Sequence, residues 1–134
     1  MKDTTGGQIG TPGRSTASCA AESDPFVALV DLRPAIAGDG RINVASIDAS
    51  PGDALFLPAG VAHGFYARDP LTLIYLVTNE YDGTDEHGFM WSDPDVAVAW
   101  PDAAPTVSPR DASAQSLAEL LVRLRDQPGQ SESR

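Results

Sequence analysis

The sequence predicts an all-β sandwich or barrel with one helix near the C-terminus. Short β-branched or apolar runs recur along the middle of the chain, and glycine, proline, aspartate or asparagine separates each run from the next. A leucine repeat with helical spacing stands out near the end. At 134 residues and 42% hydrophobic composition, the chain suits one compact domain with a single core.

Six runs have the composition of strands, and they cover residues 26–32, 42–47, 54–57, 61–67, 71–78 and 96–100. The connections carry turn residues, as in AGDG at 37–40, SPGD at 50–53 and the corner at 68–70. In LPAG at 57–60, Pro58 and Gly60 fit the i+1 and i+3 positions of a type I turn. This alternation of strands and turns favours the all-β architecture.

Leucines at i, i+3, i+4 and i+7 predict the helix, and they are Leu117, Leu120, Leu121 and Leu124. Ser113 and Ser116 are both candidate N-caps, and Pro128-Gly129 closes the segment. The polar, breaker-rich ends lack a periodic pattern and are expected to be flexible. The predicted organisation is therefore a flexible segment over 1–24, a β-domain over 25–112, a helix over 113–126 and a flexible tail over 127–134.

The charge balance limits the class of partner. Nine basic and nineteen acidic residues give a net charge of −10, which opposes binding to nucleic acid and to anionic membranes. A phosphorylated ligand would need a local cluster drawn from Arg33, Arg41, Arg68 and Arg110. The chain shows no signal peptide or membrane-spanning run, and its single cysteine is Cys19, so a cytoplasmic protein without disulfides is expected.

His63 is the first candidate for chemistry. In VAHGFYA at 61–67, strand alternation places His63 and Phe65 on one face and Gly64 and Tyr66 on the other. Two interpretations remain open: an imidazole satisfied by a backbone carbonyl, or a pocket imidazole that binds a ligand or exchanges a proton near neutral pH. A metal site would need further histidine or carboxylate ligands at short spacing, and His87 stands apart, so we expect neither metal nor cofactor.

A second group of candidates lies in residues 79–95. Tyr81 precedes an acidic loop, and its phenol is either a packing group or a general acid. Trp91 either stacks on a planar ligand or fills the core. Neither choice is decided by the sequence.

Several motifs occur in a specific order: VDLRP at 30–34, PAGVAHGF at 58–65, Y-x-V-T-x-x-Y at 75–81, a W-S-D-P-D segment from Trp91, and V-S-P-R-D at 107–111. Together they resemble the C-terminal two-thirds of the dTDP-4-dehydrorhamnose 3,5-epimerase family, from about residue 26 to residue 121. The resemblance implies a metal-free, cupin-type jelly roll that forms a homodimer by sharing strands. It also implies a barrel that holds a nucleotide-linked 4-keto sugar.

The resemblance implies roles for individual residues. Family enzymes remove protons beside a ketone with a histidine base and reprotonate the enolate with a tyrosine acid. Carried over, His63 is the second pocket histidine, Tyr81 the acid, and Asp111 the carboxylate that orients the base. We further expect Arg33, Phe65 and Trp91 to contact the substrate.

The sequence also departs from the family pattern. The R-G-L-H motif that carries the usual base has no counterpart in residues 1–25, and Val27 replaces an aspartate at the start of the V-D-L-R strand. Three functions follow: an epimerase-like isomerase or cyclase in which His63 is the base and Tyr81 the acid, a degenerate homologue that serves as a binding or assembly partner, and an authentic dTDP-4-keto-6-deoxyhexose 3,5-epimerase. The first, placed in a deoxysugar or secondary-metabolite pathway, is the leading hypothesis.

Overall fold

The computed structural model describes residues 4–9, 16–20, 24–77 and 87–126, and these form a mainly β fold with short helices. The strands are β1 (Thr4–Ile9), β2 (Thr16–Ala20), β3 (Phe26–Asp31), β4 (Asn43–Asp48), β5 (Ala54–Leu57), β6 (Val61–Tyr66), β7 (Leu73–Val77) and β8 (His87–Phe89). The helices are α1 (Arg33–Ile36), α2 (Pro109–Ala112) and α3 (Leu117–Asp126).

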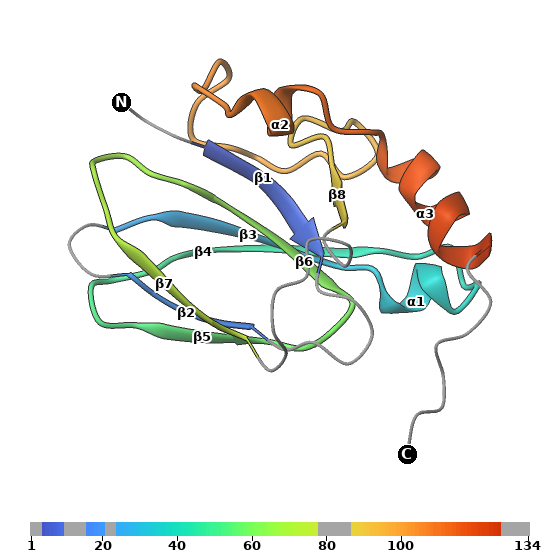
Figure 1. The fold of residues 1–134 in the computed structure, drawn as a ribbon, viewed down its shortest axis with the longest axis horizontal. Coiled ribbons are helices and arrows are strands. Elements are labelled where there is room, and N and C mark those ends of the chain that lie inside the picture. The colour runs from blue at the N-terminus through green and yellow to red at the C-terminus, as the bar shows by residue number, and fades with distance from the viewer. Residues whose placement is uncertain (1–3, 10–15, 21–23, 78–86, 127–134) are drawn as a thin grey trace.

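The strands form two antiparallel sheets. One sheet has the order β4-β3-β6-β1-β8, and the other has the order β5-β2-β7. In Figure 1 the three-stranded sheet lies on one side of the five-stranded sheet, and α2 and α3 lie on the other. The predicted mainly β architecture is confirmed, whereas the strand pairs of the described ranges do not close into a continuous barrel.

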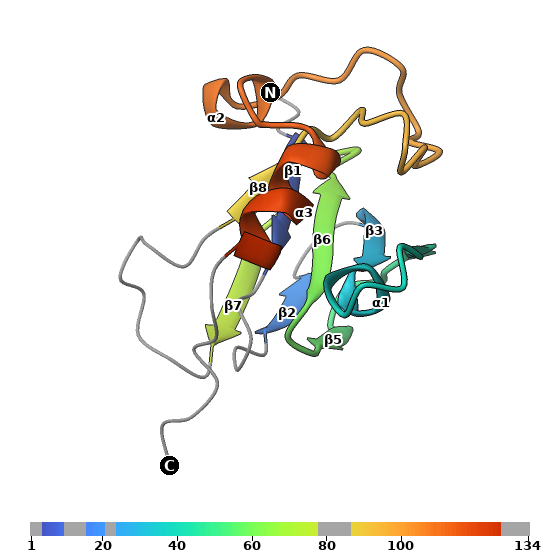
Figure 2. The ribbon, with the colours of Figure 1, turned by 90° about the vertical axis from the view of Figure 1, so that its right-hand side faces the viewer.

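The main core lies between the five-stranded sheet and the C-terminal segment. Its buried side chains come from β3, β6, β8, α3 and the loop before α2, and they include Val30, Ala62, Phe89, Val96, Leu117 and Leu120. Full burial of such a side chain is worth about 1.5–3 kcal/mol. Figure 2 shows α3 in front of β8 and β1, where its leucines cover the sheet. Because strand side chains alternate, the odd-numbered residues of β3 and β6 are left for the opposite face.

The start of α3 confirms one of the two predicted caps. The backbone N–H of Glu119 donates to Ser116 Oγ at 3.2 Å, and the backbone N–H of Ser116 donates to the Glu119 carboxylate at 2.8 Å. This reciprocal pair is a capping box. At the other end, Arg125 donates to the carbonyl of Ala35 at 2.9 Å, which ties α3 to α1. Ser113 instead follows the separate short helix α2.

Within residues 1–24, predicted as a flexible segment, the described ranges 4–9 and 16–20 are strands. β1 pairs with β6 and β8, and β2 pairs with β5 and β7. Neither strand carries the apolar alternation by which strands are recognised in a sequence. Their place in the fold is defined by their pairing partners rather than by their own composition.

Residues 96–100, predicted as a strand, form turns instead. The backbone N–H groups of Val96 and Ala97 donate to the Asp93 carbonyl at 3.2 and 3.0 Å, and Ala97 has a φ of 51°. Pro94 and Pro101 flank the segment, and proline cannot donate to a ladder. The apolar run therefore packs on the sheet as a loop.

The turn before β6 lies one residue later than predicted. Val61 donates its backbone N–H to the Pro58 carbonyl at 3.2 Å, so the turn comprises residues 58–61. Gly60 is its third residue, with a φ of 84°. A positive φ at that position is the requirement of a type II turn, whereas the prediction had placed Gly60 at the last position of a type I turn.

Candidate active site

The candidate site lies on the face of the five-stranded sheet that is turned toward the three-stranded sheet. His63 is in the middle of β6, directly opposite Leu29 of β3. Tyr75 is in the middle of β7, in the other sheet. The centroids of the two rings are 6.3 Å apart, with an angle of 40° between the ring planes. His63 and Tyr75 belong to different sheets, and their rings thus lie close together between the two sheets.

The His63 ring is buried without a hydrogen bond. Neither ring nitrogen has a partner among the described residues, and both are shielded from solvent. Burial lowers the pKa of His63 below its usual 6.5, and the Val61 carbonyl opposes this only in part, since it makes no geometrically acceptable hydrogen bond with the ring. Of the two interpretations of His63, the structure therefore disfavours the histidine satisfied by a carbonyl. The neutral ring has one donor and one acceptor available.

Tyr75 is the phenol that the structure places beside this imidazole, and sequence reasoning missed it. The residue is 42% exposed, so it lies at the rim of the space between the sheets. Desolvation nevertheless raises the pKa of Tyr75 to about 12, so its hydroxyl stays protonated at neutral pH. Strand alternation within 71–78 predicts that Tyr75 shares a face with Leu73 and Val77. It does not predict that Tyr75 lies opposite His63, because a local pattern carries no information on which distant strands face each other.

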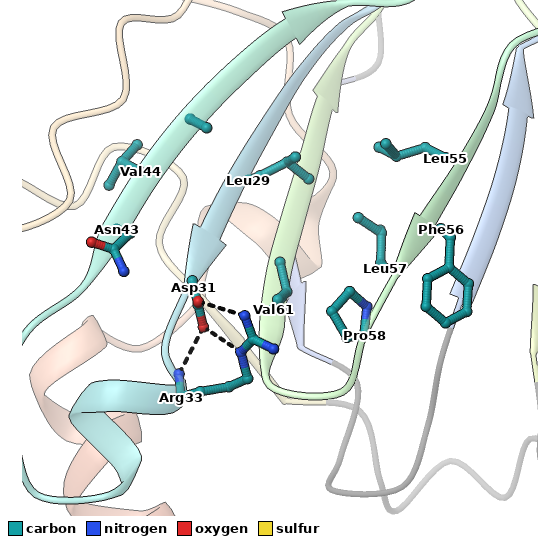
Figure 3. Close-up of a pocket in the computed structure, with 11 residues that line it drawn as sticks. Leu29, Asp31, Arg33, Asn43, Val44, Leu55, Phe56, Leu57, Pro58 and Val61 are labelled. Atoms are coloured by element: carbon teal, nitrogen blue, oxygen red, sulfur yellow. Dashed lines mark hydrogen bonds and ion pairs between the residues drawn. The ribbon is translucent and has the colours of Figure 1, made fainter.

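A pocket of about 290 Å³ lies between β3, β4, β5 and β6 (Figure 3). Apolar residues form most of its walls: Leu29, Val44, Ala45, Leu55, Phe56, Leu57, Pro58 and Val61. Asp31, Arg33 and Asn43 form one polar end. Arg33, predicted to bind substrate, thus lines a pocket. His63 and Tyr75 are not among the lining residues, although Val61 and Leu29 are close neighbours of His63 in the sheet.

The polar end of the pocket is organised by a two-pronged ion pair. Arg33 Nε and Nη2 donate to the two carboxylate oxygens of Asp31, each at 2.8 Å, and the Arg33 backbone N–H donates to Asp31 Oδ1 at 3.0 Å. The side-chain hydrogen bond from Arg33 lowers the pKa of Asp31, and the same bond raises the pKa of Arg33. Gly60 makes this arrangement possible, because a Cβ there would lie 2.7 Å from Arg33 Cγ.

The other predicted site residues are dispersed. Phe65 is half-buried on β6 two residues after His63, on the same face by alternation. Trp91 packs edge-on against Trp100, at 6.3 Å between centroids, and accepts the Trp100 indole N–H on its carbonyl. Trp100 in turn packs on Phe26, on the face of the sheet that the helices cover, so Trp91 belongs to this aromatic group. Tyr81 lies outside the described residues.

Asp111 lies in α2 and is buried. Its carboxylate accepts the Ser108 hydroxyl at 2.8 Å, while its backbone N–H donates to Ser108 Oγ at 3.1 Å. Arg110 approaches the same carboxylate at 3.6 Å. Among the described residues no hydrogen bond or ion pair joins Asp111 to His63, so its predicted role in orienting a base stays a prediction.

Metal ligands do not gather in the part of the chain that the structure describes: no group of three or more histidine, cysteine, aspartate or glutamate side chains is suitably placed there. Likewise, no helix within the described ranges is both long and apolar enough to span a membrane.

Comparison with known proteins identifies related chains. Residues 20–119 match the sequence model of the family described as dTDP-4-dehydrorhamnose 3,5-epimerase. The chain is 37% identical over 109 residues to dTDP-4-dehydrorhamnose 3-epimerase of Streptomyces niveus, covering 81% of this chain and 53% of that one. It is 36% identical over 99 residues to dTDP-4-dehydrorhamnose 3,5-epimerase of Mycobacterium tuberculosis, covering 71% and 49%. The chain thus spans about half the length of these relatives.

Solved structures give the same relationship. NovW of Streptomyces spheroides, a 4-keto-6-deoxy sugar epimerase from the novobiocin biosynthetic gene cluster, superposes with a TM-score of 0.75 at 31% identity, covering 91% of this chain and 63% of that one. ChmJ of Streptomyces bikiniensis, a 3'-monoepimerase solved in complex with dTDP-quinovose, superposes with a TM-score of 0.71 at 28% identity, covering 92% and 72%.

Proposed function

Because this chain belongs to the dTDP-4-dehydrorhamnose 3,5-epimerase family, we propose that it is an epimerase-like isomerase that moves protons on a small keto substrate. The reaction belongs to deoxysugar or secondary-metabolite biosynthesis, as the names of the relatives suggest. A dTDP-linked 4-keto-6-deoxy sugar is the first substrate to test.

The buried, unpartnered ring of His63 is the observation that carries this proposal. Leaving a buried polar group unsatisfied costs about 1–3 kcal/mol, so the fold bears a cost that a bound ligand would relieve. The lowered pKa keeps the imidazole neutral near pH 7, which is the form a base requires. His63 would take a proton from the carbon beside the ketone, and the substrate would become an enolate.

Tyr75 is the proposed proton donor. Its ring lies beside His63, and its raised pKa keeps the phenol protonated, so its hydroxyl carries a proton that can be transferred to an enolate carbon, leaving a phenolate. Donation to the face opposite the one that lost the proton inverts that carbon. Tyr81, the phenol predicted from the sequence, remains a second candidate for the same step.

A second candidate function is a binding or assembly role without catalysis. The face of the three-stranded sheet that is turned away from His63 supports it, because three large apolar side chains are exposed there: Phe56 at 68%, Ile74 at 54% and Leu76 at 65%. Exposed apolar patches of this kind mark interaction surfaces. A homodimer that shares strands remains the proposed assembly in either case.

Solvent deuterium exchange tests the proposal directly. The protein is mixed with dTDP-4-dehydro-6-deoxyglucose in D2O, and loss of the proton signals beside the ketone is followed by NMR. We expect catalysed exchange, and we expect His63→Gln to slow it by about 10²-fold or more, as removal of a general base does. His87→Gln is the matched control, since it alters the other histidine of the chain, and it should exchange at the wild-type rate.

Two results would contradict the proposal. Exchange that survives undiminished in His63→Gln would show that another group is the base. A folded wild-type protein that binds the sugar nucleotide but catalyses no exchange would leave the binding role as the function of this chain.

A further inference from the structure

We propose that the pocket between β3, β4, β5 and β6 is a second ligand site, distinct from the proton-transfer pair. Its ligand class is an uncharged molecule with a flat apolar body and one hydrogen-bond acceptor at its end. The site is built by residues that the proposed reaction does not use, so its occupancy does not depend on the proposed function.

The walls suit an apolar body. Leu29 and Val61 line the pocket from the five-stranded sheet, and Leu55, Leu57 and Pro58 line it from β5 and the turn that follows (Figure 3). Leu57 and Val61 are buried, and the other three are half-buried. A volume of about 290 Å³ is at the lower end of the range that small-molecule pockets occupy, about 300–1,000 Å³. The pocket therefore accepts a compact, ring-sized group rather than a peptide or a dinucleotide.

The polar end offers hydrogen-bond donors in a fixed direction. Asp31 engages Arg33 through Nε and Nη2, and no hydrogen bond of Nη1 occurs among the described residues. A guanidinium has five N–H donors in one plane, and the pair with Asp31 uses only those on Nε and Nη2. The N–H groups of Nη1 are therefore able to donate to a ligand. Because Asp31 and the close packing of Gly60 fix the stem of Arg33, that edge is held in place before a ligand arrives.

Charge selects a neutral ligand over an anionic one. The Asp31 carboxylate already balances the Arg33 guanidinium at 2.8 Å, so the pair has little net charge to attract an anion. The whole chain carries a net charge of −10, which repels anions further. A carbonyl oxygen can accept from Nη1 without displacing Asp31, whereas a sulfonate, phosphate or carboxylate would be placed next to that carboxylate.

Titration with 6-propionyl-2-dimethylaminonaphthalene tests the site. This neutral two-ring ketone changes its emission to the blue when it leaves water, so binding is read from the spectrum. We expect saturable binding with a blue shift. Replacing the ketone with a sulfonate, in 6-dimethylaminonaphthalene-2-sulfonate, should weaken binding by about ten-fold or more, because the anion would lie next to the Asp31 carboxylate in a chain of net charge −10.

Variants locate the binding. Leu55→Trp should fill the pocket and abolish the blue shift. Arg33→Lys keeps a cation beside Asp31 but removes the planar fork, and it should weaken binding about ten-fold. Arg41→Lys is the matched control, because Arg41 also donates through Nε and Nη2 to an aspartate two residues earlier, Asp39, but on the exposed surface outside the pocket. Leu76→Ser controls for adsorption to the exposed apolar sheet face, and both controls should bind like the wild type.

The proposal is overturned if the ketone does not bind saturably, if Leu55→Trp and Arg33→Lys both bind it like the wild type, or if the sulfonate binds equally well. Arg33 is more than half exposed, so its variant remains informative even if Leu55→Trp fails to fold. His63→Gln should leave ketone binding unchanged while it slows deuterium exchange by about 10²-fold or more. The two assays therefore fail separately: absent exchange refutes the reaction, and absent ketone binding refutes this pocket.

Discussion

His63 is held neutral by its surroundings. Its neighbours on the face turned toward the three-stranded sheet are apolar. Leu29 of β3 lies directly opposite His63, and Val61 lies two residues before it in β6. Apolar neighbours desolvate the imidazolium, and no carboxylate contacts the ring within the described residues to offset that cost. A residue so placed acts as a base or as a hydrogen-bond partner for a ligand, and not as a permanent cation.

The lowered pKa of His63 makes the stability of the protein depend on pH. The unfolded chain binds this proton near its usual pKa of about 6.5, whereas the folded chain binds it only at lower pH. Between the two pKa values the unfolded state holds more protons, so the free energy of unfolding falls as the pH decreases through that window. In urea denaturation at about pH 7.5 and about pH 5, His63→Gln should lose less stability than the wild type. Equal losses, or an NMR pKa of His63 above 6.5, would contradict this account.

Gly60 is the backbone residue on which the pocket depends. Gly60→Ala would combine a φ of 84° with a Cβ that overlaps the stem of Arg33 at 2.7 Å. Gly38→Ala is a suitable control, since its φ is 92° but nothing lies within 4 Å of the added methyl group. Both should pay the backbone strain, and Gly60→Ala should cost about 1–3 kcal/mol more through overpacking. Equal midpoints of urea denaturation for the two variants would show that Arg33 moves aside without cost.

Among the elements, α3 depends on the hydrogen bonds at its N-terminus, and these also affect the packing of the main core. Ser116 and Glu119 satisfy each other's backbone N–H groups, and Asp93 accepts the backbone N–H of Leu117 at 2.7 Å. Leu117 and Leu120 in turn are almost fully buried against the five-stranded sheet. Loss of the cap therefore loosens the main core as well as the helix.

Ser116→Ala should lower the free energy of unfolding by about 1 kcal/mol, which is the usual worth of an N-cap. Ser113→Ala is the matched control. Its hydroxyl donates to the carbonyls of Pro109 and Arg110 on the exposed side of α2, and its removal should cost no more than about 0.5 kcal/mol. Chemical denaturation measures both. A larger loss from Ser113→Ala would mean that α2, and not the capping box, anchors the C-terminal segment.

Elements with a strong local pattern could be predicted from the sequence. The strands β3, β5, β6 and β7 fall within predicted runs, β4 extends one residue beyond its run, and the leucine repeat predicts α3. β1 and β2 could not be found this way, since their residues become strands through partners far along the chain. Residues 96–100 show the converse error: an apolar run between prolines packs on the core without pairing.

The candidate site was predictable only in part. Strand alternation predicts that His63 and Phe65 share a face of their strand, and in the structure His63 lies on a face where its ring is 6.3 Å from that of Tyr75. The contact with Tyr75 depends on how β6 and β7, which belong to different sheets, face each other. No local sequence pattern predicts that arrangement. The roles of Trp91 and Asp111 were predicted from motifs that resemble those of the family. In the structure Trp91 packs against Trp100 and Asp111 accepts a hydrogen bond from Ser108, and the motifs alone do not specify these contacts.

At the scale of the molecule, three arginines of the described ranges each form an ion pair with a nearby aspartate. Arg33, Arg41 and Arg68 lie 2.8, 2.5 and 2.6 Å from Asp31, Asp39 and Asp48. The arginine cluster considered for a phosphorylated ligand is therefore not assembled from these side chains, each of which contacts its own carboxylate. A diphosphate bound at any of them would have to compete with a carboxylate already in place.

The central claim is that one imidazole and one phenol, facing each other between two sheets, transfer protons on a keto sugar. The most direct measurement is the rate at which dTDP-4-dehydro-6-deoxyglucose forms epimerised product, followed together with its deuterium uptake, with Tyr75→Phe compared with Tyr66→Phe. Tyr66 lies on the opposite face of β6, where its hydroxyl donates to Asp102. We predict that Tyr75→Phe retains exchange beside the ketone but forms epimerised product at least about ten-fold more slowly, while Tyr66→Phe matches the wild type. Wild-type epimerisation by Tyr75→Phe would contradict the account.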